Sequence, residues 1–153
     1  MIETLKQRLF WLVARTCFAA YRVFPIFGRL RASIGIIYRD GKFLMIERND
    51  GRGVSLPGGI SSRGEAAEAT IHREVHEETG LDVVQATLLF EYFSDNDVPV
   101  NTSLFRVTVR GEMKDSWEGR PRWMTVEEME PRILPSQRRV VDEMRKILAV
   151  DQV

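Results

Sequence analysis

The stretch that decides the fold is Gly59–Leu81, GISSRGEAAEATIHREVHEETGL. It contains five glutamates, and three of them, Glu74, Glu77 and Glu78, lie within five consecutive residues. Three alanines in its first half have high helix propensity, and the glycine before its last residue is the type that commonly ends a helix. The stretch therefore predicts a helix over residues 65–79 that is unusually rich in acidic side chains.

The acidic side chains of this predicted helix do not fall on a separate solvent face. At about 100° per residue, Ile71 and Val75 define the apolar arc of the helix. Glu74 and Glu78 lie in or beside the same arc, and Glu77 lies just outside it. A solvated acidic face would not share its arc with aliphatic side chains, so we expect these carboxylates to have a function.

Electrostatics indicates what that function is. Glu77 and Glu78 occupy the last helical turn, where the helix dipole disfavours each anion by about 0.3–1 kcal/mol. Glu74 and Glu78 also repel each other as an i, i+4 pair, at a cost of about 0.2–0.5 kcal/mol. A divalent cation such as Mg²⁺ would remove both penalties and still bind substrate phosphates. His72 and His76 have zinc-chelating spacing, but they face away from the acids and are expected to be exposed.

The same stretch resembles the signature of the Nudix hydrolases. All nine specified positions of that signature are filled without a gap, by Gly59, Glu65, Arg73, Glu74, Val75, Glu77, Glu78, Gly80 and Leu81. The resemblance implies an α+β fold, the Nudix-type α/β/α sandwich on a mixed β-sheet. It also implies hydrolysis of a pyrophosphate bond in a nucleoside diphosphate linked to a group X, such as a nucleoside triphosphate, an oxidised dNTP or a nucleotide sugar. The implied cofactor is Mg²⁺ or Mn²⁺.

The resemblance implies roles for individual residues of this box. The implied metal ligands are Glu74, Glu77 and Glu78, joined by the carbonyl of Gly58 or Gly59. Glu74 is alternatively the base that orients the attacking water. Glu65 is similar to the outer carboxylate of the family, and Arg73 to the residue that holds the loop and that carboxylate together.

Four residues outside the box are also predicted to belong to the site. Glu118, with the residues that follow it, is similar to a further metal ligand of the branch that hydrolyses oxidised dGTP. Gln137 lies roughly where that branch has an amide side chain that contacts the base. On the residues alone, Glu118 fits a surface acid of a loop equally well, and Gln137 fits a first-turn helix residue. Arg48 and Leu56, near the two ends of the glycine-rich loop before the box, complete the predicted substrate-binding residues.

The rest of the chain predicts strands around the central helix and one further helix. The strands are expected at residues 32–40, 41–48, 81–94 and 101–111, with a short one at Trp123 and Met124. Asp40-Gly41 is typical of a hairpin turn. A charged loop is expected over residues 112–122. The last helix is expected over residues 134–150, with Ser136 as its cap.

The N-terminal segment differs in character from the rest. Residues 5–24 carry apolar side chains at helical spacing, with three arginines spaced seven residues apart. Two of these arginines interrupt the apolar run, so a membrane-spanning helix is not expected. Peripheral membrane binding, a homodimer contact and packing on its own domain all fit an amphipathic helix. We therefore expect an N-terminal helical appendage over residues 1–29 and a Nudix domain over residues 30–153.

Composition restricts the function classes further. The formal net charge is zero, which argues against general nucleic-acid binding. Cys17 has no partner for an internal disulfide, which favours the cytoplasm, with or without a peripheral position at the inner face of the membrane. The expected partner is a small nucleotide. The alternatives are an RNA 5′-end pyrophosphohydrolase, which would need a basic and aromatic surface, and a non-catalytic nucleotide-binding regulatory module, which would have lost box carboxylates.

Overall fold

The structure is a computed structural model that describes residues 9, 12, 13, 16, 17, 20, 30–96 and 99–151. The strands are β1 (Leu30–Arg39), β2 (Lys42–Arg48), β3 (Val54–Ser55), β4 (Gly58–Ile60), β5 (Asp82–Ser94), β6 (Val100–Arg110) and β7 (Gly119–Met124). The helices are α2 (Ala67–Thr79), α3 (Val126–Met129), the 3-10 helix η1 (Pro135–Val140) and α4 (Val141–Asp151).

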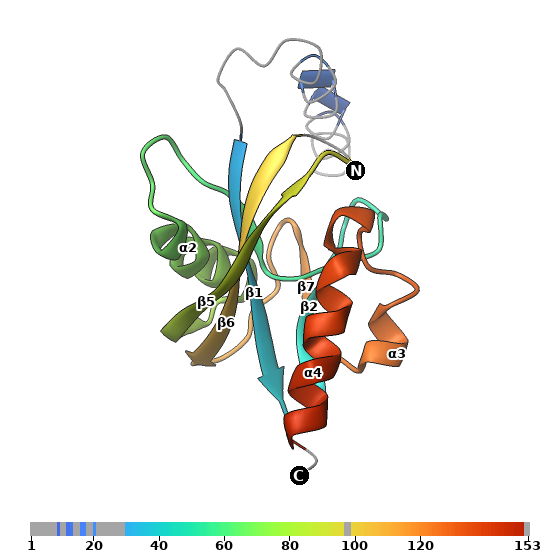
Figure 1. Ribbon diagram of the computed structural model, residues 1–153. Helices are drawn as coiled ribbons and strands as arrows, with labels where there is room; N and C mark the ends of the chain where they lie inside the picture. The colour runs from blue at the N-terminus through green and yellow to red at the C-terminus, as the bar shows by residue number, and fades with distance from the viewer. Residues whose placement is uncertain are drawn as a thin grey trace.

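A mixed sheet of seven strands forms the centre of the fold, with β3-β2-β1-β6-β5 as its main order (Figure 1). Strands β1 and β6 are parallel, and the other pairs are antiparallel. The register joins β1 to β2 only beside their hairpin turn, at Tyr38 with Phe43 and Arg39 with Lys42. Farther from the turn, β4 pairs with β1 and β3 pairs with β2. The segment that links β3 to β4 therefore lies where the two long strands separate.

Each face of the sheet is covered by helix. Helix α2 lies on one face, while α3 and α4 lie on the other (Figure 1). Consecutive strand residues point to opposite faces, so Ile36 belongs to the core under α3 and α4, while Ile37 belongs to the core under α2. Both cores are closely packed by fully buried side chains, among them Phe43 on one face and Ile71 on the other. The predicted α/β/α sandwich on a mixed sheet is confirmed.

Several local predictions are also confirmed. Asp40 and Gly41 both have left-handed backbones, with φ of 48° and 79°, as the predicted hairpin turn requires. Helix α2 ends at Gly80, whose φ is 73° and whose N–H donates to the carbonyl of His76. The helix begins two residues later than predicted, and its N-cap residue, Ala66, makes no side-chain capping hydrogen bond.

Residues 112–122 were expected to form a loop, and this prediction was wrong at its C-terminal end. Strand β7 begins at Gly119 and pairs with β2 along its whole length, from Arg48 opposite Gly119 to Phe43 opposite Met124. Pro121 lies within the strand, which an edge strand tolerates because its outer side needs no backbone donor. Pairing with a strand about 75 residues earlier in the sequence, rather than local propensity, sets where β7 begins.

The expected single helix over residues 134–150 was also wrong in its first part. A 3-10 helix precedes α4, and its N-cap position is Leu134, without a side-chain capping bond. Ser136 is therefore not the cap, and its carbonyl instead accepts a hydrogen bond from Tyr92 Oη at 3.3 Å. Pro135 begins the 3-10 helix, and an isolated bridge between Val54 and Ile133 holds the preceding segment against the sheet.

Six residues of the predicted N-terminal appendage fall within the described part of the chain. All six are helical and exposed: Leu9, Leu12, Val13, Thr16, Cys17 and Ala20. The other residues of the predicted 1–29 segment lie outside the described residues, so the division at residue 30 stays a prediction. Across the parts of the chain that are described, no helix is both long and apolar enough to cross a bilayer.

Candidate functional site

Helix α2 directs acidic side chains toward the sheet. Glu74 and Glu78 are buried, with 8% and 3% of their surface exposed, in the same layer as the fully buried Ile71 and Val75. The side chain of Glu77, just outside this arc, is 58% exposed. The structure therefore places two of the predicted ligands in the interior and the third at its edge. His72 and His76 are exposed, as expected.

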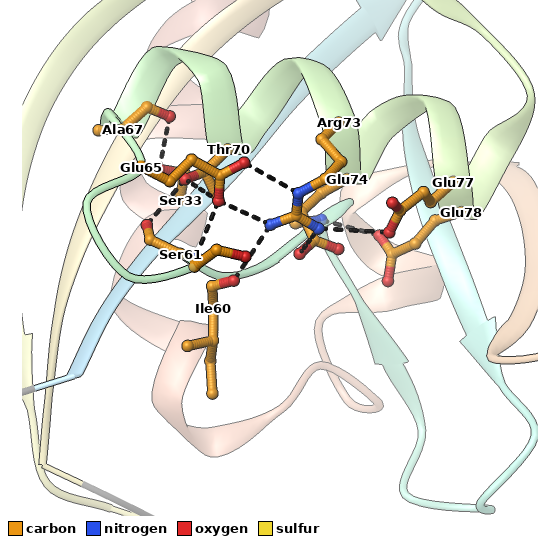
Figure 2. A network of polar contacts seen from close by, with 12 residues as sticks. Ser33, Ile60, Ser61, Glu65, Ala67, Thr70, Arg73, Glu74, Glu77 and Glu78 are labelled. Atoms are coloured by element: carbon orange, nitrogen blue, oxygen red, sulfur yellow. Dashed lines mark hydrogen bonds and ion pairs between the residues drawn. The ribbon is translucent and has the colours of Figure 1, made fainter. Parts of the chain in front are cut away.

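Arg73 lies at the centre of the polar network (Figure 2). Its Nε and Nη2 donate to the two carboxylate oxygens of Glu65, each at 2.9 Å. Its Nη1 donates to Glu74 at 2.7 Å and to Glu77 at 3.3 Å. Nη2 also donates to the carbonyl of Ile60 at 3.3 Å. Mainly through these hydrogen bonds, the guanidinium lowers the pKa of Glu65 to about 2. Arg73 thus joins the loop before α2 to the acidic face of the helix.

Small polar side chains reinforce the same loop. Glu65 Oε2 also accepts from the Ser62 amide at 2.8 Å and from Thr70 Oγ1 at 3.1 Å. The Thr70 hydroxyl lies 2.8 Å from that of Ser61, and Ser33 Oγ donates to the carbonyl of Ala67 at 2.8 Å. Sequence reasoning did not identify these residues. Helical spacing gave no signal for Thr70, which is fully buried but falls beside Glu77, outside the arc of Ile71 and Val75.

Gly58 and Gly59 bring the backbone of β4 against the two buried acids. The Gly58 amide donates to Glu78 Oε2 at 2.8 Å, and its φ is 148°. A side chain at Gly58 would place Cβ 2.2 Å from the carbonyl oxygen of Ser33. At Gly59, Cβ would lie 2.6 Å from the carboxylate of Glu74. Glycine is required at Gly58, where the close neighbours are backbone atoms, whereas a side chain at Gly59 would displace the end of the Glu74 side chain.

The electrostatic environment of the buried acids is unfavourable to their charge. Burial raises the pKa of Glu74 and raises the pKa of Glu78 well above its usual value. The Gly58 amide and Arg48 act in the opposite direction on Glu78. The carboxylate of Glu118 raises both pKa values further, so it lies within electrostatic reach of the pair. Glu118, at the start of β7, is thus brought toward the box by the pairing of β7 with β2.

The acidic cluster supplies part of the ligand set that a divalent cation needs. Among the described residues, no three His, Cys, Asp or Glu side chains are arranged to hold a metal. Arg73 neutralises part of the acidic charge in place of a cation, because its Nη1 contacts both Glu74 and Glu77. Glu74 Oε2 and Glu78 Oε1, however, have no hydrogen-bond partner within the described chain. Carboxylate oxygens without protein donors are ligands that Mg²⁺ prefers, so the residues fit a divalent cation.

A cavity of about 170 Å³ lies next to Gly58 and Gly59. Its walls come from β1, β4, β5, β6 and η1, and they include Gln137. Gln137 Oε1 accepts a hydrogen bond from the Leu56 amide at 2.8 Å. Since a backbone N–H can only donate, the other end of this amide, Nε2, is a donor. The Leu56 side chain is fully buried in the core, so only its backbone contributes to this region.

The predicted substrate-binding residue Arg48 lies at the end of β2. It forms an ion pair with Asp50, with 2.7 Å between Nη2 and Oδ2. The structure thus brings Glu65, Arg73, Glu74, Glu77, Glu78, Glu118, Arg48, Gly58 and Gly59 to one region, with Gln137 at the adjoining cavity.

Comparison with known proteins agrees with this arrangement. The family model of the NUDIX domain matches residues 29–144. A curated relative, the ADP-ribose pyrophosphatase of Methanocaldococcus jannaschii, is 43% identical over 68 residues. That match covers 42% of this chain and 40% of the relative, so the two proteins are alike over less than half of either length.

Two solved structures share the fold. The MutT NUDIX hydrolase from Burkholderia pseudomallei has a TM-score of 0.66 and 22% identity, over 74% of this chain and 96% of that one. The ORF135 protein of E. coli has a TM-score of 0.68 and 19% identity, over 80% of this chain and 92% of that one. With the family model covering most of its length, a complete box and the same sandwich of sheet and helices, the chain belongs to the NUDIX domain family.

Proposed function

We propose that this protein hydrolyses a pyrophosphate bond in a nucleoside diphosphate linked to a second group, with a divalent cation as cofactor. The observation that carries the proposal is the buried pair Glu74 and Glu78, which lies against Gly58 and Gly59 with an unbonded oxygen on each carboxylate. Burying a carboxylate is costly, and here one hydrogen bond to Arg73 and one to the Gly58 amide leave the second oxygen of each acid for a cation or a proton. Their position beside a cavity supports a functional role rather than a role in stability.

The residues that would hold Mg²⁺ or Mn²⁺ are Glu74 and Glu78, with Glu118 close by and Glu77 joining when it turns from Arg73. Bound there, a divalent cation neutralises phosphate charge and activates water for attack on phosphorus. Arg73 would keep Glu65 and the loop before α2 fixed while the acids exchange partners. Arg48 would supply positive charge to the phosphates from the end of β2.

The nucleoside would occupy the cavity next to β4. Its walls combine apolar side chains from β1, such as Ala32 and Ile34, with the ring of Tyr92 and the amide of Gln137. This is the usual composition of a small-molecule site, in which few polar groups fix the orientation of an otherwise apolar ligand. Gln137 Nε2 would donate to an acceptor on the base. Gly58 and Gly59 line the cavity and also contact the acids, so a bound nucleoside would direct its phosphates toward them.

The direct test is a hydrolysis assay with purified protein and Mg²⁺. The panel would contain nucleoside triphosphates, oxidised dNTPs, nucleotide sugars, dinucleotides, 5′-triphosphate RNA and ADP-ribose, the last because one relative is an ADP-ribose pyrophosphatase. We expect cleavage between phosphates of at least one small nucleotide, and none after chelation of the metal. Cleavage of the RNA alone would favour the RNA 5′-end alternative. Binding without cleavage of any compound would favour the regulatory module.

A second proposal concerns the N-terminal segment, where Leu9, Leu12 and Val13 are 60%, 62% and 53% exposed. We propose that this apolar surface binds the anionic inner face of the membrane peripherally, because residues 1–31 contain six basic residues and one acidic residue. Cosedimentation with phosphatidylserine vesicles should be lost when residues 1–28 are deleted. Equal cosedimentation of the full chain and the truncated chain would contradict the proposal. If the full chain is a dimer and the truncated chain is a monomer, a homodimer contact would be favoured instead.

A further inference from the structure

Arg48 lies beside the acidic cluster because of how β2 pairs. The register of β2 with β7 places Arg48 opposite Gly119, the residue directly after Glu118. Its positive charge also lowers the pKa of Glu78, in opposition to the larger effect of burial. Arg48 therefore contributes cationic charge to the site from a strand of the sheet.

Asp50 holds one edge of this guanidinium. Arg48 Nε lies 3.1 and 3.2 Å from the two oxygens of Asp50, and Nη2 lies 2.7 Å from Oδ2. The pair is largely withdrawn from solvent, with side-chain exposures of 15% for Arg48 and 6% for Asp50. Asp50 also accepts from the amide of Arg52 at 3.1 Å. Burial raises the pKa of Asp50, but these hydrogen bonds outweigh that effect and lower it overall.

The loop that carries Asp50 is bonded to the segment that carries Glu118. The Asn49 amide donates to the carbonyl of Glu118 at 3.0 Å, and Asn49 Nδ2 donates to the carbonyl of Trp117 at 2.9 Å. The Arg48 amide donates to the carbonyl of Gly53 at 3.1 Å, which closes the loop. The guanidinium, its aspartate and the start of β7 therefore form one connected unit.

We propose that Asp50 is a positioning residue, which holds Arg48 beside Glu78 and Glu118 so that its guanidinium meets the phosphates of the substrate. This inference rests on the proposed function. An arginine side chain has many rotamers, and an acceptor that grips one edge of the planar guanidinium removes most of that freedom. The opposite edge is then directed away from Asp50. Without Asp50, the side chain would lose these three hydrogen-bond contacts, and more of its ordering would have to occur when phosphate binds.

The pair could instead serve only to stabilise the loop, and a double-mutant cycle separates the two roles. The four proteins are wild type, Arg48→Gln, Asp50→Asn and the double variant, which leaves neither charge unpaired. The measured quantity is the dissociation constant of α,β-methylene ADP with Mg²⁺, a probe that retains two phosphates and is not cleaved. The matched control is Glu47→Gln, which breaks the neighbouring exposed ion pair between Glu47 and Arg132. Asp50→Glu retains the charge and tests for rescue.

We expect Asp50→Asn to weaken probe binding about 10-fold, Arg48→Gln to weaken it at least as much, and the double variant to bind like Arg48→Gln alone. Asp50→Glu should recover part of the loss, and Glu47→Gln should bind like wild type. Additive losses, unchanged binding by Asp50→Asn, or no binding of the probe by wild type would each overturn the inference. Because the probe is not hydrolysed, failure of the hydrolysis panel is distinguished from failure of this assignment.

Discussion

Arg73 holds both oxygens of Glu65, each at 2.9 Å, while its remaining Nη1 contacts Glu74 and Glu77. One guanidinium thus connects a surface loop to the acidic face of α2 (Figure 2). Because Glu65 takes one whole edge of Arg73, the direction of the other edge is fixed. The geometry makes Glu65 important for the site although it lies eight residues before Arg73.

Replacing Glu65 should therefore impair activity through Arg73. Glu65→Gln keeps the shape but loses the charge that Arg73 pairs with, so we expect the kcat for the best substrate to fall about 10-fold or more. Glu68→Gln is the matched control, since Glu68 is an exposed acid in the first turn of the same helix. Equal kinetics for the two variants would show that the Glu65 contact does not matter to the reaction.

Gly59→Ala should disturb the site directly. The new Cβ would lie 2.6 Å from the carboxylate of Glu74, so this side chain must move. We expect a large loss of kcat/KM with the two cores intact, measured by steady-state kinetics and thermal unfolding. Gly64→Ala serves for comparison. The backbone at Gly64 is left-handed, with φ of 78°, so alanine is strained there, but its Cβ would meet no atom within 4 Å. Gly64→Ala should therefore lower stability rather than activity.

Gln137→Glu should change which base is preferred. The carboxylate can still accept the hydrogen bond from the Leu56 amide, but its second oxygen then replaces the Nε2 donor by an acceptor. We expect the ratio of kcat/KM for an inosine nucleotide over the matching adenosine nucleotide to decrease. Gln85→Glu, on the exposed part of β5, should leave the ratio unchanged. An unaltered ratio in Gln137→Glu would mean that the amide does not contact the base.

Ala66→Ser should stabilise the protein. Ala66 has the extended backbone of an N-cap residue, with φ of −70° and ψ of 148°, but no side-chain oxygen to accept a bond from the first turn. A serine cap is worth about 0.5–2 kcal/mol relative to alanine. Urea denaturation should reveal this increase, whereas Ala69→Ser, inside the same helix, should slightly destabilise. A lower unfolding free energy for Ala66→Ser would contradict the described start of α2.

The sequence was most informative where the physics is local. The positions of Ile71 and Val75 fix the buried arc of α2, and this arc correctly predicts that Glu74 and Glu78 are buried. Glu77 was not expected on the solvent side either, but its side chain is 58% exposed. The hairpin at Asp40 and the end of α2 at Gly80 follow from backbone preferences of single residues.

What could not be predicted depends on pairing between distant segments. Glu118 was a candidate only through the family resemblance, because it comes close to the buried acids through the pairing of β7 with β2, and no local pattern encodes that register. The contact of Gln137 with Leu56 joins two segments that are 81 residues apart. Asp50 is one of many acids in the sequence, and its importance is visible only once Arg48 is placed at the end of β2.

The central claim is that the buried acids bind a divalent cation that the hydrolysis requires. Glu78→Gln tests it most directly, since glutamine retains an acceptor for the Gly58 amide while removing a charge whose burial is unfavourable. We predict that the variant is at least as stable as wild type, because the buried charge is gone. We also predict that its Mg²⁺-dependent kcat/KM is lower by at least about 10²-fold. Near wild-type activity in Glu78→Gln, or wild-type hydrolysis that persists after complete chelation of the metal, would contradict the account.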